Sequence, residues 1–188
     1  EVVENFRPTI LVGVAGQPGA FTEAVVRAMA ENAQRPIIMP LSNPTDYAEA
    51  RPEEILRWTD GRALVATGSP FADVVMDGRR HLIGQGNNVF IFPGLGLGTL
   101  LSEARQVSDG MIAAAAHTLA EVVRQESLGE SRLYPRVAWL RQSTRAVTIA
   151  VMRTAVEEGL CPPLDEREIE ERLAAAHWEP EYPPYEAG

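Results

Sequence analysis

The first part of the chain alternates short apolar runs with segments that have the spacing of amphipathic helices. Residues 9–14, 37–41 and 63–67 form the apolar runs and predict buried strands. Strands that alternate with helices in this way are typical of a parallel sheet with helices on its faces. A fourth strand is expected at residues 89–92, after an irregular excursion over residues 73–83. The pattern therefore predicts the α/β fold class.

Local signals at the ends of the predicted elements agree with this reading. Thr22 is a favoured residue for capping a helix start, and Pro52 stands at a first-turn position that proline prefers. Asp77 and Gly78 predict a turn inside the excursion, because both residue types tolerate turn conformations. These signals indicate a helix after each of the first two strands.

The rest of the chain has the apolar spacing of helices. We expect helices over residues 95–105, from a cap at Ser108 onward, over residues 137–157, and after a capping pair at Asp165. Residues 178–185 contain too many prolines for a helix and predict an extended arm.

Composition narrows the function classes. The net charge is -9 and no basic patch is visible, which argues against a nucleic-acid partner. No apolar stretch approaches the ~20 residues that span a bilayer, so we expect no membrane partner. The single cysteine, Cys161, excludes an internal disulfide and suits a reducing compartment. All seventeen basic residues are arginine, so a mechanism that needs lysine cannot be completed by these residues.

Two polar runs carry the candidate chemistry. Asn43 follows the second apolar run, and Asn87 and Asn88 precede the fourth. A primary amide donates and accepts hydrogen bonds without charge, which suits a hydroxy acid or the carboxamide of a nicotinamide. Each run taken alone is also explained by turn formation, because asparagine is common in turns.

The glycine-rich segments have different expectations. The sequence Gly13-Val14-Ala15-Gly16 ends the first predicted strand, where open α/β sheets bind ligands, although an ordinary turn fits the position equally well. The glycines of residues 94–98 follow the fourth predicted strand, and we assign them to close packing of a helix on the sheet. Ser69 is expected to be a turn residue, and the three histidines lack the spacing of metal ligands.

Six runs, taken in order, resemble the C-terminal part of a malic enzyme of the large-subunit type. The likeness covers nearly the whole chain and continues to its closing residues. The runs are ILVGVAGQPGAFT (10–22), RPII (35–38), LSNPT (41–45), ATGSPF (66–71), GQGNNVFIFPG (84–94) and RLYP (132–135).

The resemblance implies a partial Rossmann-type parallel sheet, the later strands of an NAD(P)-binding domain, over residues 1–105. C-terminal helices and a proline-rich arm are expected over residues 106–188. Within the family, Asn43 and Asn87 correspond to amides that contact malate. The positions matched to the cofactor are Val14, Ala15, Gly16, Ser42, Asn43 and Asn88.

The implied activity is oxidative decarboxylation of L-malate to pyruvate and carbon dioxide, with NAD or NADP and with Mg²⁺ or Mn²⁺. The family's catalytic tyrosine and lysine, and its acidic metal ligands, precede the segment that this chain resembles. We therefore expect a truncated or processed chain that begins at Glu1, contains no catalytic or metal-ligating residue, and is inactive alone. The alternatives are a non-catalytic binding or assembly module and an oxidoreductase for another hydroxy acid. A cytoplasmic location and a homo-oligomer are further expectations from the family.

Overall fold

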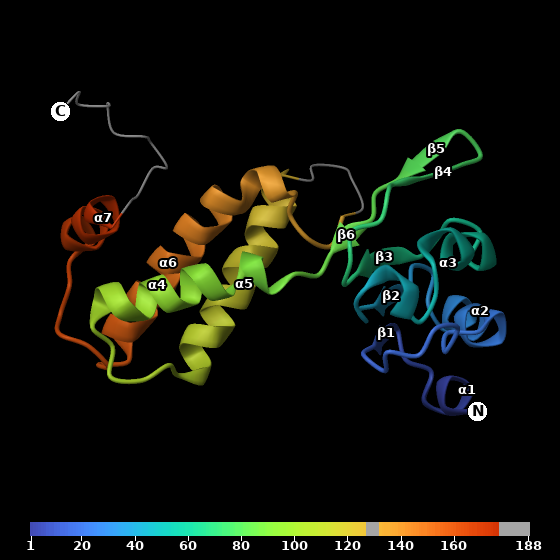
Figure 1. The fold of residues 1–188 in the computed structure, drawn as a ribbon. Helices are drawn as coiled ribbons and strands as arrows, with labels where there is room; N and C mark the ends of the chain where they lie inside the picture. The colour runs from blue at the N-terminus through green and yellow to red at the C-terminus, as the bar shows by residue number, and fades with distance from the viewer. Residues whose placement is uncertain (127–131, 177–188) are drawn as a thin grey trace, which may run out of the picture.

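The computed structural model describes residues 1–126 and 132–176. A parallel sheet with its helices lies at one end of the molecule, and a group of long helices lies at the other (Figure 1). The strands are β1 (Ile10–Gly13), β2 (Ile37–Pro40), β3 (Leu64–Thr67), β4 (Val74–Met76), β5 (Arg79–His81) and β6 (Gly84–Gln85). The α-helices are α1 (Val2–Phe6), α2 (Glu23–Asn32), α3 (Pro52–Trp58), α4 (Phe92–Ser102), α5 (Asp109–Glu126), α6 (Leu140–Glu157) and α7 (Glu166–Ala175). Short 3₁₀ helices are η1 (Thr45–Tyr47), η2 (Asn88–Phe90) and η3 (Val137–Trp139).

The main sheet is parallel and has the order β1-β2-β3-β6. The predicted α/β fold with a parallel sheet is therefore confirmed. The strand β1 stands at one border of the sheet, and its outer edge is unpaired among the described residues. Unpaired strand edges can recruit another chain, so self-association stays a prediction.

One face of the sheet forms the core of this end of the molecule. Leu11, Ile38 and Val65 share a register row, and they pack against α2 and α3 through residues such as Met29 and Ile55. The register row of Ile10 and Ile37 lies on the opposite face, where Ile10 is 52% exposed. Parallel sheets usually bury both faces, whereas this second face is open among the described residues.

The fourth strand is not where the sequence placed it. Residues 89–92 contain no strand, and β6 lies earlier, at Gly84–Gln85. The side chain of Asn87 accepts a hydrogen bond from the backbone N–H of Val89 and starts the helical turn η2. Phe90, 1% exposed, explains why the run is apolar. A short apolar run does not by itself distinguish a strand from a buried helical turn.

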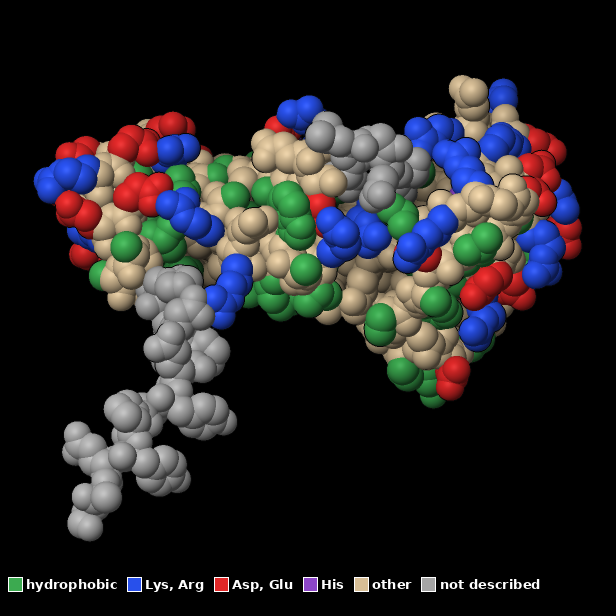
Figure 2. Space-filling view, turned by 90° about the horizontal axis from the view of Figure 1, so that it is seen from above, with side chains coloured by type: hydrophobic (Ala, Val, Ile, Leu, Met, Phe, Trp, Pro, Cys, Tyr) green, Lys and Arg blue, Asp and Glu red, His purple; other side chains and the backbone are tan. Residues whose placement is uncertain are grey.

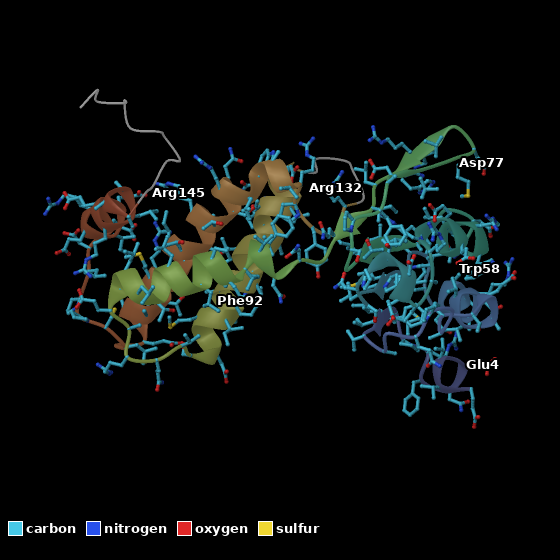
Figure 3. All side chains as sticks on the ribbon, viewed as in Figure 1. Glu4, Trp58, Asp77, Phe92, Arg132 and Arg145 are labelled. Carbon is cyan, nitrogen blue, oxygen red and sulfur yellow. The ribbon has the colours of Figure 1, made fainter. Side chains whose placement is uncertain are left out.

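The expected irregular excursion is an antiparallel hairpin of β4 and β5. Its tip has the predicted turn, where Asp77 and Gly78 both have positive φ. Such a pair favours the tight turn that matches the twist of two antiparallel strands. Asp77 lies at the end of the hairpin, away from the long helices (Figure 3).

The long helices form a second packed group. Helix α4 begins three residues earlier than predicted, at Phe92, and lies beside α6 in the group of long helices (Figure 1). A Cβ atom at Gly94 or Gly98 would lie 2.7 Å from a carbon of Val147 or Val151 on α6. These glycines therefore permit close packing of one helix on another. The predicted close packing of a helix is therefore present, but the glycines pack against helix α6 and not against the sheet as predicted.

Most predicted helix starts are confirmed. The side chains of Thr22, Ser108 and Asp165 accept hydrogen bonds from backbone N–H groups in the first turns of α2, α5 and α7. Helix α6 begins at Leu140 because residues 137–139 form the turn η3. The predicted arm at residues 178–185 lies outside the described residues. The division of the chain at residue 105 stays a prediction.

Candidate binding site at the carboxyl edge of the sheet

A hollow of about 540 Å³ lies at the carboxyl ends of the four parallel strands. This volume falls within the usual range for small-molecule sites, and open parallel sheets bind ligands at this edge. Four of the sequence-predicted site residues line it. The lining residues are Val14, Leu41, Asn43, Gly68, Ser69, Pro70, Gln85, Gly86, Asn87 and Asn88.

The amide of Asn43 is held in one orientation. Its Oδ1 accepts a hydrogen bond of 2.6 Å from the hydroxyl of Ser69, and its Nδ2 donates to the carbonyl oxygen of Leu41 at 3.3 Å. An amide nitrogen carries two hydrogens, so one N–H of Asn43 remains for a ligand. The peptide bond that follows, between Asn43 and Pro44, is cis.

Asn87 and Asn88 are both exposed at the rim of the hollow. Because the Oδ1 of Asn87 accepts from the N–H of Val89, the amide nitrogen of Asn87 is the atom left to face a ligand. The turn role and the binding role therefore use different atoms of the same side chain. Asn87 can therefore start the turn and contact a ligand at the same time, so the two interpretations of this residue are compatible.

The other three predicted residues, Ala15, Gly16 and Ser42, lie beside the hollow rather than in its lining. The backbone N–H of Gly16 donates to the hydroxyl of Ser42 at 2.8 Å, and the N–H of Ala15 donates to the carboxylate of Glu49 at 2.8 Å. The hydroxyl of Ser42 in turn donates to the same carboxylate. These bonds fix the segment that follows β1, and with it Val14, against the end of β2.

Glu49 is the centre of this network and is completely buried. Burial by itself would raise the pKa of the carboxyl group, because it disfavours the charged form. Hydrogen bonds from the Ser42 hydroxyl and from the backbone N–H groups of Ala15 and Ser42 outweigh burial and lower the pKa of Glu49 below its ordinary value of 4.5. Glu49 is therefore a carboxylate at neutral pH.

Sequence reasoning missed two residues of the site, Glu49 and Ser69. Glu49 occurs between Ala48 and Ala50, and an acid flanked by two small apolar residues was the available signal of a buried, partnered group. Ser69 was assigned to a turn, and nothing in the sequence indicates that its hydroxyl reaches Asn43, 26 residues earlier.

The hollow is neutral among the residues that the structure describes. Its lining contains amide, hydroxyl and backbone groups, with no aspartate, glutamate, arginine or histidine. Within the described ranges, no group of three or more His, Cys, Asp or Glu side chains could hold a metal ion. No described helix is long and apolar enough to cross a membrane. A ligand bound here would be oriented by neutral hydrogen bonds, and compensation of its charge would have to come from other groups.

A larger hollow of about 670 Å³ lies between α4, α6 and α7. It is lined mainly by apolar side chains and contains none of the predicted site residues. The smaller hollow at the sheet edge is the better candidate site, because polar groups from several strands converge there.

Comparison with known proteins identifies the family. The family model described as "Malic enzyme, NAD binding domain" matches residues 1–156. NAD-dependent malic enzymes from Shewanella baltica strain OS155 and from Shewanella oneidensis are each 48% identical over 185 residues. The alignments cover 98% of this chain and 33% of each relative, so the chain spans about a third of the relatives' length.

Solved structures agree. The malic enzyme from Pyrococcus horikoshii Ot3 superposes with a TM-score of 0.67 at 25% identity, covering 88% of this chain and 34% of that one. The Entamoeba histolytica malic enzyme also has a TM-score of 0.67, at 22% identity, and it supports the fold alone. The predicted resemblance is therefore confirmed.

Proposed function

Because the chain belongs to the malic enzyme family, through its NAD-binding domain, we propose that it forms part of an enzyme that oxidatively decarboxylates L-malate to pyruvate and carbon dioxide. The observation that carries the proposal is the convergence of Asn43, Asn87 and Asn88 at one hollow of the sheet edge. The cofactor proposed is NAD, with NADP as the alternative, since the relatives are named as NAD-dependent.

The residues of this chain would orient malate and the nicotinamide. Asn43 and Asn87 would each offer an amide N–H to a hydroxyl, carboxylate or carboxamide oxygen. Ser69 would keep the Asn43 amide turned correctly, and Glu49 with Ser42 would hold the strand end at Val14. A fixed orientation lowers the barrier by making a near-attack geometry common.

The donor set fits the nicotinamide end of a dinucleotide, because a neutral rim of amides and backbone groups can pair with a carboxamide. When bound, the nicotinamide would supply the hydride acceptor. The described residues do not fit a divalent metal, so the proposed Mg²⁺ or Mn²⁺ needs ligands from elsewhere. The chain also contains no lysine that could act as the base of the reaction.

The first test measures NAD(P)H formation from malate and Mn²⁺ by the 188-residue chain and by a longer polypeptide that includes it. We expect no turnover above a blank for this chain and clear turnover for the longer protein. Turnover by the chain alone would contradict its proposed incompleteness. If the longer protein oxidised another hydroxy acid in place of malate, the alternative oxidoreductase would be favoured. If the longer protein oxidised no hydroxy acid at all, a non-catalytic binding module would be favoured.

A second test uses Asn87→Ser in the longer polypeptide that includes this chain, called the active protein below. Serine keeps an oxygen that can cap the turn at Val89, but it lacks the amide N–H groups. We expect kcat/KM for malate to fall by the equivalent of about 1–3 kcal/mol, with little change in Tm. Asn5→Ala, on α1, serves as the control. An unchanged kcat/KM for Asn87→Ser would leave the residue with its turn role alone.

A further inference from the structure

A second hollow, of about 500 Å³, lies at the opposite, amino-terminal edge of the same sheet. It is built from the residues just before β2, from the turn and start of β3, and from β5 with the link into β6. This edge is separate from the amide-lined hollow, because each parallel strand runs from one edge to the other. None of the residues assigned to the proposed activity contributes to it.

Four arginines line this hollow: Arg35, Arg62, Arg79 and Arg80. Among the described residues that line it there is a single carboxylate, Asp60. The concentration is unusual for a chain with a net charge of -9. Arginine side chains also gather in Figure 2 at the end of the molecule that carries the sheet.

Two of the arginines are held in place by the fold. A guanidinium nitrogen of Arg62 donates to the carbonyl oxygens of Ala30 at 2.9 Å and Gln34 at 3.3 Å. Arg80 pairs with Asp73 at 2.7 Å, and Asp73 also accepts from the backbone N–H of Ile83. Carbonyl partners orient a guanidinium without neutralising its charge, so Arg62 keeps its positive charge at the hollow.

Arg79 differs from most arginines of the chain. It has no hydrogen bond or carboxylate partner among the described residues, and it lies beside His81, whose ring packs over Gly61. Elsewhere on the molecule, several arginines pair with glutamates. Examples are Arg27–Glu23, Arg124–Glu121, Arg145–Glu170, Arg153–Glu166, Arg167–Glu171 and Arg172–Glu103.

We propose that this amino-edge hollow binds a small polyanion that carries phosphate or carboxylate groups. A guanidinium presents several N–H donors in a plane that matches the oxygens of both groups. A hollow of this size accepts a small molecule, and the acidic remainder of the chain disfavours a nucleic acid. The site is independent of malate chemistry and stands whether or not the proposed function is correct.

The test measures binding of inorganic pyrophosphate and of citrate to the 188-residue chain by calorimetry, in about 0.15 M salt so that weak surface attraction is screened. We expect at least one probe to bind with a Kd of about 1 mM or lower. The tighter probe identifies phosphate or carboxylate as the preferred group. In NMR spectra, the shifted backbone amides should be those of residues 34–35, 60–64 and 79–82.

Arg79→Gln and Arg35→Gln should each weaken binding about tenfold, the usual effect of losing one charged hydrogen-bond donor. Arg167→Gln, on α7, should leave the Kd unchanged, and melting curves should show that the variants fold. The proposal is overturned if neither probe binds at millimolar concentration, or if Arg79→Gln and Arg35→Gln both bind like the parent. It is also overturned if the shifted amides lie at the amide-lined hollow.

Discussion

Glycines bring two chain segments together both at the carboxyl edge of the sheet and in the long helices, but the contacts they permit differ. At the edge, a Cβ on Gly68 would lie 2.0 Å from the carbonyl oxygen of Leu41 and 2.9 Å from the amide nitrogen of Asn43. In α4, a Cβ on Gly98 would meet a side-chain carbon of Val151 at 2.7 Å and the carbonyl oxygen of Thr148 at 2.8 Å.

The atoms around these two glycines distinguish the candidate binding site from the packed core of the long helices. The neighbours of Gly68 are polar atoms whose positions set the geometry of the amide-lined hollow. The neighbours of Gly98 belong mostly to an apolar interface, where closeness contributes dispersion and burial. A substitution at the first place should damage stability and ligand geometry together, whereas one at the second should damage stability alone.

The largest effect is expected for Gly68→Ala. The methyl group would overlap a backbone carbonyl, which cannot rotate away, so β2 and β3 must separate where they end. We expect the free energy of unfolding to fall by about 2–4 kcal/mol in urea denaturation. In the active protein, the KM for malate should also rise.

If Gly68→Ala left both stability and KM unchanged, the close approach of the two strand ends would not exist in solution. A loss of stability without any change in KM would separate the strand ends from the proposed site. Either result would break the contrast drawn between the sheet edge and α4.

The second prediction compares two glycines of α4. Gly98→Ala should lower the free energy of unfolding by about 1–3 kcal/mol, because α4 would be forced away from α6. Gly96→Ala should raise it by up to about 1 kcal/mol, because Gly96 is exposed with open space around it and alanine favours the helix. Urea denaturation of both variants measures the two signs. Equal effects would mean that α4 does not pack through Gly98.

The sequence predicted the first three strands of the sheet well, because these are short apolar runs that alternate with helices. Thr22 and Asp165 cap as expected, since a side chain that bonds a backbone group three residues on is a local property. The fourth strand was misplaced because residues 89–92 are apolar for a different reason, the burial of Phe90 in a helical turn.

The site was predictable only in part. Its amides could be found because asparagine at a strand end is visible in a sequence, and the family resemblance added their order. The groups that hold them could not, because the bond from Ser69 to Asn43 and the bonds of Glu49 to Ala15 join residues 26 and 34 positions apart. Such contacts depend on the strand order β1-β2-β3, which no local pattern specifies.

Ser69→Ala tests one of these contacts and rests on the proposed function. The hydroxyl that fixes the Oδ1 of Asn43 is lost, so the amide can turn over. We expect kcat/KM for malate in the active protein to fall by the equivalent of about 1 kcal/mol, roughly fivefold. Ser102→Ala is the matched control, because Ser102 is also buried and its hydroxyl bonds a carbonyl within α4. An equal loss in both variants would indicate general destabilisation.

The last prediction concerns pH and Glu49. Its pKa is lowered in the folded state, so the carboxylate contributes stability above its ordinary pKa near 4.5 and loses that contribution as the pH falls through the folded value. Glu49→Gln removes this titration and leaves the N–H of Ala15 with a weaker acceptor. At pH 7 the variant should be less stable than the parent by about 1–3 kcal/mol.

This difference should shrink as the pH falls below 4.5 and through the lowered pKa of Glu49 in the folded state, because the parent then also comes to carry an uncharged group at position 49. Urea denaturation of both proteins at several pH values measures it, and the comparison cancels the titration of the other acids. A difference that stays constant from pH 7 to well below 4.5 would mean that charge on Glu49 does not hold the strand end. In that case the segment at Val14 would be fixed by packing, as α4 is, and the contrast between the two regions would narrow.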